Sequence, residues 1–80
     1  MIRLSKHAQE ALNERNIAFE WVERTIAAPD FTRLDPNDPS QTCSFKAIDE
    51  AGGRILRVVH RPEGDDILFA TVHSDRGARR

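Results

Sequence analysis

The amino-acid sequence predicts an α+β fold, a two-helix hairpin packed on one face of a three- or four-stranded antiparallel β-meander. Apolar residues recur at helical spacing between residues 5 and 29, which indicates amphipathic helices. Residues 42–74 instead divide into three segments rich in valine, isoleucine and phenylalanine, separated by short connectors that contain glycine. Connectors this short join antiparallel neighbours.

The 80 residues leave room for a single domain, 1–80. We divide it into a helical hairpin at 5–29, a loop at 30–41, a β-meander at 42–74 and a frayed tail at 75–80. The net charge of -1 excludes a strongly basic nucleic-acid binder but permits a local basic patch. The sequence has neither a bilayer-spanning apolar run nor a signal-peptide core, so we expect a cytoplasmic protein with no membrane partner.

Two short helices are expected in the helical hairpin. Ser5 can cap the first helix, because its hydroxyl can accept a hydrogen bond from an amide of the first turn. Asn16 ends this helix, since asparagine tolerates the left-handed backbone conformation. The second helix ends before Pro29 and carries an apolar stripe of Phe19, Val22 and Ile26. Before the hairpin, residues 1–4 form either an edge strand or a lead-in.

Three strands are expected at 42–49, 54–61 and 66–74. Residues 31–34 are a candidate for one more strand, although the segment 35–40 that follows is dense in turn residues. Hairpin loops of four residues pair Asp49 with Arg54, and Arg61 with Asp66. Both pairs match opposite charges, which favours this register.

In this register the two faces of the sheet differ. The face expected against the helices is almost wholly apolar and carries Cys43, Phe45, Ala47, Leu56, Val58, His60, Ile67, Phe69 and Thr71. The exposed face is also largely aliphatic and carries Ser44, Lys46, Ile48, Ile55, Arg57, Val59, Leu68, Ala70 and Val72. Lys46 falls directly opposite Arg57 there, and two facing cations repel each other unless an anion neutralises them.

We interpret the exposed face as a binding surface for RNA or for an acidic partner protein. The expected interface residues are Ile55, Val59, Leu68 and Val72. Three alternatives stay open: a register that differs by one residue, a loop carboxylate of Asp35 or Asp38 folded over the two cations, or dimerisation of two copies through this face.

Few residues carry recognisable chemistry. His7, near the start of the first helix, can act as an acid–base group of a metal-independent ribonuclease, or it can simply orient the helix. We predict His7 and Arg57 as its catalytic residues. His60 and His73 are expected at strand edges, near opposite ends of the meander. The single cysteine, Cys43, excludes a disulfide framework, and we expect no metal, no cofactor and no specific DNA binding.

Several short segments resemble a known family. They are Ser5-Lys6-His7-Ala8, Arg15-Asn16-Ile17, Val22, Pro29, Arg57-Val58-Val59 and Thr71-Val72. The chain resembles a family of small bacterial proteins known only as a domain of unknown function, with the pattern SKHA…ER-G-I…V…P and then a short meander. That family looks distantly like the BrnT and RelE/ParE toxins. Asn16 stands where the family usually has glycine, and His73 where relatives often have tyrosine.

This resemblance implies a toxin-like enzyme that cleaves messenger RNA and is inhibited by a partner antitoxin. By position it implies RNA- or partner-binding roles for Arg15, Lys46, Arg57, Arg79 and Arg80, beside His7. The alternative is a non-enzymatic interaction module that pairs with itself or with another protein through the same sheet face. The sequence leaves open whether the protein is an enzyme.

Overall fold

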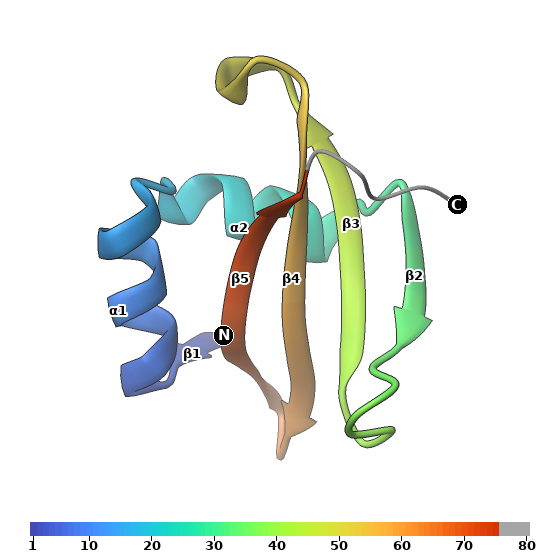
Figure 1. The fold of residues 1–80 in the computed structure, drawn as a ribbon. Helices are drawn as coiled ribbons and strands as arrows, with labels where there is room; N and C mark the ends of the chain where they lie inside the picture. Colours follow the sequence, from blue (N-terminus) through green and yellow to red (C-terminus); the bar gives the residue numbers. More distant parts are fainter. Residues whose placement is uncertain (76–80) are drawn as a thin grey trace.

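Five strands form one sheet in the order β1-β5-β4-β3-β2, and two helices pack against it (Figure 1). The computed structural model describes residues 1–75. Its elements in chain order are β1 (Ile2–Leu4), α1 (Lys6–Arg15), α2 (Phe19–Ala27), β2 (Phe31–Leu34), β3 (Thr42–Ile48), a 3-10 turn (Asp49–Ala51), β4 (Arg54–Glu63) and β5 (Asp66–Asp75). The α+β class is confirmed. The expectation of a purely antiparallel sheet with three or four strands is wrong, because β1 pairs parallel to β5.

The parallel strand β1 covers the outer edge of β5. The Ile67 amide donates to the Met1 carbonyl at 3.0 Å, and the Ser5 amide donates to the Phe69 carbonyl at 3.2 Å. Without β1 these backbone groups of β5 would line an unpaired sheet edge. The chain between β1 and its parallel partner β5 runs through both helices and strands β2, β3 and β4, which provides the long connection that a parallel pair requires.

The helix caps agree with the sequence prediction. The Ala8 amide donates to Ser5 Oγ at 3.0 Å, and Asn16 adopts the left-handed conformation with φ 52° and ψ 47°. α2 follows without a side-chain cap at Ala18 and ends at Ala27, two residues before Pro29. Within residues 1–75, no helix is long and apolar enough to cross a membrane.

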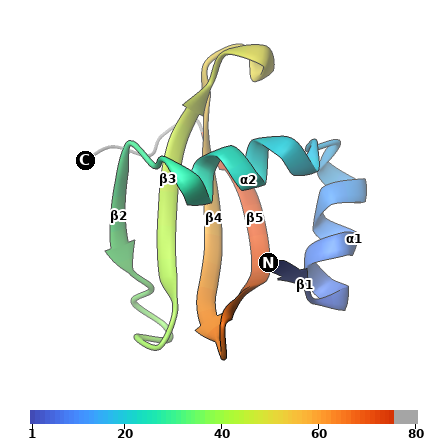
Figure 2. The ribbon, with the colours of Figure 1, turned by 180° about the vertical axis from the view of Figure 1, so that it is seen from behind.

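The helices give the sheet one covered face. α2 crosses behind β4 and β3, whereas α1 stands beside β5 (Figure 1), and the view from behind shows α2 in front of the strands (Figure 2). The larger core lies between α2, α1 and the sheet, where Val22, Val58, Phe69 and Val72 are each 0% exposed. No helix among residues 1–75 covers the opposite face, which we call the open face.

Both hairpins differ in register from the prediction. The loop between β3 and β4 has one residue more than expected, so Ile48 pairs with Arg54. Gly52 and Gly53, with φ of 71° and 77°, provide the left-handed backbone that this loop needs. The turn between β4 and β5 is shorter than expected and pairs Glu63 with Asp66, so the predicted pairs Asp49 with Arg54 and Arg61 with Asp66 are wrong.

The shift of one residue exchanges the two faces of β3, because successive side chains of a strand point to opposite faces. Phe45 and Cys43 therefore lie on the open face, in a small core cluster with Val59. Lys46 lies on the helix side and pairs with Leu56, so the expected pair of facing cations does not form. Of the three alternatives to a binding surface, the register that differs by one residue is correct.

An irregularity in β5 puts Thr71 and Val72 on the faces opposite to those predicted. The register shifts between Val59 and His60, which leaves Ala70 as an extra residue, a β-bulge. Beyond it Thr71 pairs with Val59 on the open face, and Val72 points into the core beneath the helices. The expected positions of Thr71 against the helices and of Val72 on the exposed face are both wrong.

Candidate active site on the open sheet face

Side chains of four strands form two rows across the open face. The register aligns Phe31, Phe45, Arg57 and His73 in the first row. It aligns Arg33, Cys43, Val59 and Thr71 in the second. Neighbouring strands lie about 4.8 Å apart. Arg57 on β4 is therefore a neighbour of His73 and Thr71 on β5, on one surface.

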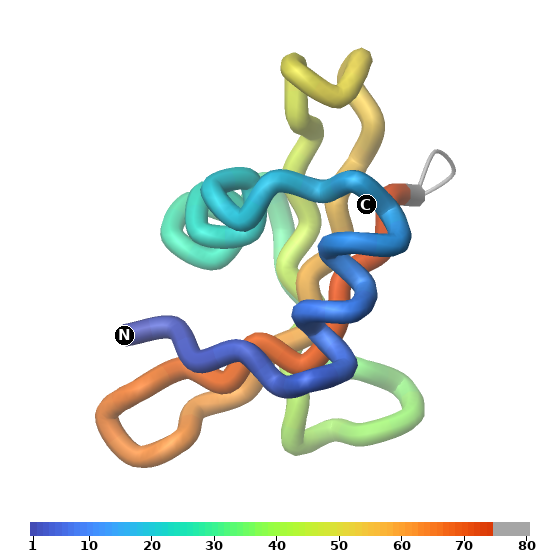
Figure 3. Tube along the Cα trace, turned by 90° about the vertical axis from the view of Figure 1, so that its left-hand side faces the viewer, coloured from blue at the N-terminus to red at the C-terminus, as the bar shows by residue number. Residues whose placement is uncertain are grey.

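A cavity of about 310 Å³ lies over these rows. Its floor consists of Cys43, Arg57, Val59, Ala70, Thr71 and His73. Its rim consists of His7 from α1 and Asp35, Pro36, Asn37 and Gln41 from the loop between β2 and β3. Figure 3 shows this loop, in light green, on the opposite side of the molecule from α2. The cavity therefore opens away from the helix-covered core.

The start of α1 is attached to β5 at the cavity. The Ser5 hydroxyl donates to the Ala70 carbonyl at 3.1 Å and accepts from the Ala8 amide at 3.0 Å. One side chain thus caps the helix and also anchors it to the bulged residue of β5. His7, in the first turn of α1, is held at the cavity rim by this anchor.

The loop that forms the rest of the rim is closed by its own hydrogen bonds. The Asp35 amide donates to the Gln41 carbonyl at 3.0 Å, and the Gln41 amide donates to the Asp38 carbonyl at 2.9 Å. The carboxylate of Asp35 accepts from the Asn37 amide at 3.0 Å, and that of Asp38 accepts from the Ser40 amide and hydroxyl. The Ser40 hydrogen bonds lower the pKa of Asp38, so this carboxylate stays charged at neutral pH.

Two polar atoms in the cavity floor have no hydrogen-bond partner among the described residues. Arg57 Nε and Thr71 Oγ1 are buried and make no hydrogen bond within residues 1–75. Buried polar groups nearly always find a partner, and leaving one without costs about 1 to 3 kcal/mol. Both atoms belong to neighbouring strands of the same cavity. The cavity floor therefore holds hydrogen-bonding capacity that residues 1–75 do not use.

Cys43 forms part of the floor but is not set up as a nucleophile. Its side chain is buried at 3% exposure. Burial raises the pKa of its thiol, the negative charge of Asp35 raises it further, and the charges of Arg57 and Arg33 oppose this only in part. The thiol therefore stays protonated at neutral pH, and thiolate chemistry is unsuited to this site.

The structure brings together the two predicted catalytic residues and separates the other cations from them. His7 and Arg57 both line the cavity. Lys46 donates instead to the Ala28 carbonyl at 2.8 Å, and its Nζ lies 3.6 Å from the Asp30 carboxylate, on the helix side. Arg15 lies at the far end of α1, beside a different cavity that Trp21 also lines. Arg79 and Arg80 lie outside the described residues.

The predicted interface residues also divide between the two faces. Ile55 and Val59 belong to the open-face cluster. Leu68 is half-buried on the same face, where it pairs with Arg61. Val72 is enclosed beneath the helices at 0% exposure. Any contact made through the open face would therefore involve the first three residues and not Val72.

His60 belongs to the helix side of the sheet and takes no part in the cavity. Its Nε2 is hydrogen-bonded to Ser44 Oγ at 2.7 Å, and Ser44 is buried at 1% exposure. Burial lowers the pKa of His60, which favours the neutral imidazole. This pair resembles a nucleophile and its base, but the burial of the hydroxyl makes it a structural contact.

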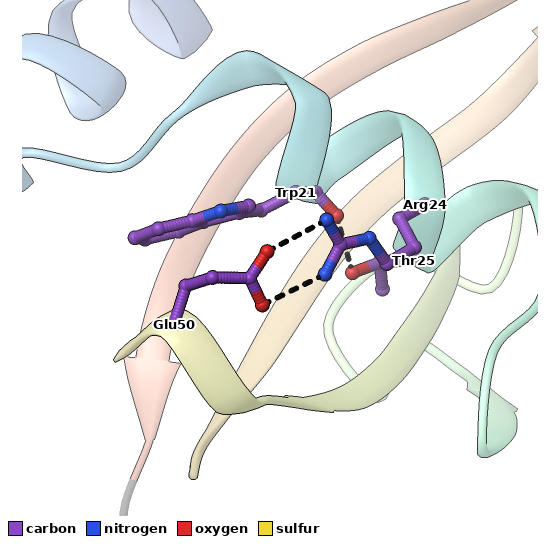
Figure 4. A network of polar contacts seen from close by, with 4 residues as sticks. All are labelled: Trp21, Arg24, Thr25 and Glu50. Carbon is purple, nitrogen blue, oxygen red and sulfur yellow. Dashed lines mark hydrogen bonds and ion pairs between the residues drawn. The ribbon is translucent and has the colours of Figure 1, made fainter. Parts of the chain in front are cut away.

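A second polar group on the helix side joins α2 to the loop between β3 and β4. The Arg24 guanidinium donates to both carboxylate oxygens of Glu50, at 3.0 and 2.8 Å (Figure 4). In the same view Thr25 Oγ1 donates to the Trp21 carbonyl at 2.7 Å. The guanidinium lowers the pKa of Glu50 through its hydrogen bond and its charge. The Arg24, Glu50 and Thr25 side chains all have hydrogen-bond partners within the protein, so this network stabilises the loop between β3 and β4.

Sequence reasoning missed His73 and Thr71 as parts of the site. With the observed register, Arg57 pairs with His73 and Val59 pairs with Thr71. The Gly64-Asp65 turn favours a tight hairpin and is the signal that could have found them, because a two-residue connection fixes the pairing of β4 with β5 near the turn. The bulge at Ala70, which then places Thr71 on the open face, leaves no comparable mark in the sequence.

Comparison with known proteins places the chain in a family but does not assign an activity. A family model described as "Domain of unknown function (DUF4258)" matches residues 4–73. No curated protein and no solved structure matches the chain. Among residues 1–75, no group of three or more histidine, cysteine, aspartate or glutamate side chains is placed to hold a metal ion.

Proposed function

Because the chain belongs to this domain family of unknown function, we propose its activity from the cavity itself: metal-independent cleavage of RNA by His7, His73 and Arg57. The observation that carries the proposal is that two imidazoles and a guanidinium line one open cavity. The sequence resemblance to the BrnT and RelE/ParE toxins supports the same reaction. It adds the proposal that a partner antitoxin covers the open face.

The reaction needs two groups that move protons. A base removes the proton from the 2′-hydroxyl, whose oxygen attacks the adjacent phosphorus. The bond from phosphorus to the 5′-oxygen breaks, and an acid protonates that oxygen as it leaves. The products carry a 2′,3′-cyclic phosphate and a 5′-hydroxyl. His7 and His73 reach the cavity from two different elements, α1 and β5, so they can act on opposite sides of one phosphate.

The reaction also needs positive charge and hydrogen-bond donors for the phosphorane. Arg57 supplies both, since its planar guanidinium can donate two parallel hydrogen bonds to phosphate oxygens. Its buried Nε and the buried Thr71 hydroxyl are the donors that lack partners within residues 1–75. Donors already fixed in place stabilise a transition state without reorganisation at the moment of reaction.

The test is cleavage of an RNA oligonucleotide by the purified full chain in the presence of EDTA. We expect 2′,3′-cyclic phosphate and 5′-hydroxyl ends, and at least a ~100-fold lower rate for His7→Gln and for His73→Gln. Arg54→Gln is the control, because Arg54 is an exposed arginine of the same strand that does not line the cavity. A folded parent protein that cleaves no RNA, or variants as active as the parent, would contradict the proposal.

A second candidate function is protein pairing through the open face. It is favoured by the half-buried apolar residues of the open face that pack on the smaller core cluster, Phe31, Ile55 and Ala70. In this case Ile55→Asp weakens a concentration-dependent complex that light scattering detects, and the His73→Gln substitution leaves that complex intact. A monomer at high concentration with no stable partner would exclude pairing.

A further inference from the structure

Arg33 lies on the open face beside the cavity. It is paired with Cys43 across β2 and β3, in the same row as Val59 and Thr71. Its guanidinium carbon lies 5.0 Å from the centre of the Phe45 ring. The side chain is exposed but lies over the sheet, and the attraction between cation and aromatic ring helps to keep it there.

The Arg33 guanidinium lies over one of two stacked aromatic rings and forms no salt bridge within the described residues 1–75. Phe45 is 1% exposed and stacks on Phe31 with ring centres 4.5 Å apart and planes at 5°. Among residues 1–75, no salt bridge involves Arg33 or Arg57. Both cations act on the same buried thiol, since both lower the pKa of Cys43 against the effects of burial and of the Asp35 charge. In the sheet, Arg33 on β2 and Arg57 on β4 belong to the two strands that flank β3, which carries Cys43.

The spacing of the two arginines suits consecutive phosphates of one nucleic-acid strand. Arg33 is on β2 and Arg57 on β4, two strands apart, which is about 10 Å between backbones. Arginine side chains can close part of this distance, and one nucleoside can bridge the rest. A strand with its scissile phosphate at Arg57 and His73 would then cross β3 and place its next phosphate at Arg33.

We propose that Arg33 is a second phosphate-binding residue, so the protein takes single-stranded RNA longer than a dinucleotide. This inference rests on the proposed function, since it uses the cavity as the site of the first phosphate. It adds a direction to the substrate path, from the cavity across β3 towards the outer strand β2. It also assigns Arg33 a positioning role, because the second phosphate takes no part in bond breaking.

The test compares two 2′-deoxyoligonucleotides, which bind but cannot be cleaved because they lack the attacking hydroxyl. One is a dinucleotide with one phosphate, and the other a trinucleotide with two. We expect Arg33→Gln to weaken trinucleotide binding about ten-fold and to leave dinucleotide binding unchanged. The salt dependence of trinucleotide binding should fall by about 0.7 in the slope of log K against log salt. Arg54→Gln, an exposed arginine on the helix side, should change neither affinity.

The outcomes separate this inference from the proposed function. If the parent protein binds both oligonucleotides equally and Arg33→Gln changes nothing, the second phosphate site is wrong and the cavity proposal stands. If the parent binds neither, the cavity proposal itself fails. With RNA trinucleotides, the same substitution should raise KM and leave kcat unchanged. A fall in kcat at constant KM would contradict a purely positioning role.

Discussion

The two faces of the sheet differ in whether their polar side chains have hydrogen-bond partners. On the helix side, Ser44 is hydrogen-bonded to His60, and Lys46 donates to the Ala28 carbonyl. On the open face, Arg57 Nε and Thr71 Oγ1 are buried without a partner in the described part of the chain. Both faces are built from the same strands, so the difference arises from what covers them.

This difference separates stability from function. Groups satisfied within the protein contribute to folding, whereas a buried group without a partner lowers stability and persists where a ligand can use it. The helix side therefore holds the fold, and we place the proposed site on the open face with its cavity. Substitutions matched across the two faces test this division.

The largest expected effect is on the helix side. Phe69→Ala should lower the free energy of unfolding by about 3 to 5 kcal/mol, because Phe69 is 0% exposed in the main core. Its neighbour Leu68, half-buried on the open face, is the matched control and should cost about 1 kcal/mol as Leu68→Ala. Urea unfolding measures both. Equal losses would contradict the assignment of the main core to the helix side.

The second largest effect is on RNA cleavage. It compares Arg57 with Lys46, which the sequence predicts to lie side by side. Arg57→Gln should lower the rate of RNA cleavage by about 100-fold or more, since a preorganised donor to the phosphorane is lost. Lys46→Gln should leave the rate unchanged, because Lys46 lies on the helix side against Ala28. Single-turnover cleavage, with the protein in excess over the RNA and above Kd, measures both. A comparable loss in Lys46→Gln would show that both faces contribute to the site.

These two cations also show how far the sequence predicts the fold. Ser5, Asn16 and Pro29 mark the helix ends correctly, since capping and proline chemistry are local. The faces of the sheet depend on loop length, and one additional residue at the Gly52-Gly53 loop moves Lys46 away from Arg57. The parallel pairing of β1 with β5 depends on contacts between distant parts of the chain, which no local pattern encodes.

Removing one buried hydroxyl should have a smaller effect on stability, with opposite signs on the two faces. Thr71→Val replaces a buried hydroxyl without a partner in residues 1–75 by a methyl group of similar size, and should raise stability by about 1 kcal/mol. Ser44→Ala removes the hydrogen bond to His60 and should lower stability by about 1 kcal/mol. Thermal and urea unfolding provide the measurement. If Thr71→Val destabilises the protein, the hydroxyl has a partner and the argument from unsatisfied groups fails.

The smallest effect is a pH dependence that belongs to the helix side. Burial holds the pKa of His60 below its usual value of about 6.5. As pH falls through that value, the unfolded chain takes up the proton before the folded protein does, so stability decreases until the folded pKa is passed. In the His60→Gln variant, the free energy of unfolding should fall less as the pH is lowered. Urea unfolding at pH 7.5 and 5.5 measures it, and an identical pH dependence in parent and variant would contradict it.

The candidate site can be predicted only in part. His7 is predicted from its residue type and its place at the start of the first helix, and Arg57 from its expected position on the exposed face. Both line one cavity. The sequence instead predicts His73 at a strand edge, because its pairing with Arg57 depends on a hairpin register that charge matching predicts wrongly. The loop residues Asp35 and Gln41 join the site only through the tertiary fold.

The most direct test of the site follows the three imidazoles by NMR while a 2′-deoxydinucleotide is added to the full chain. His7 and His73 line the cavity, whereas His60 lies on the other side of the sheet with Ser44. We predict that the resonances of His7 and His73 shift together and saturate at the same concentration, and that those of His60 stay in place. Shifts at His60 alone, or at none of the three, would contradict the phosphate-binding cavity on the open face.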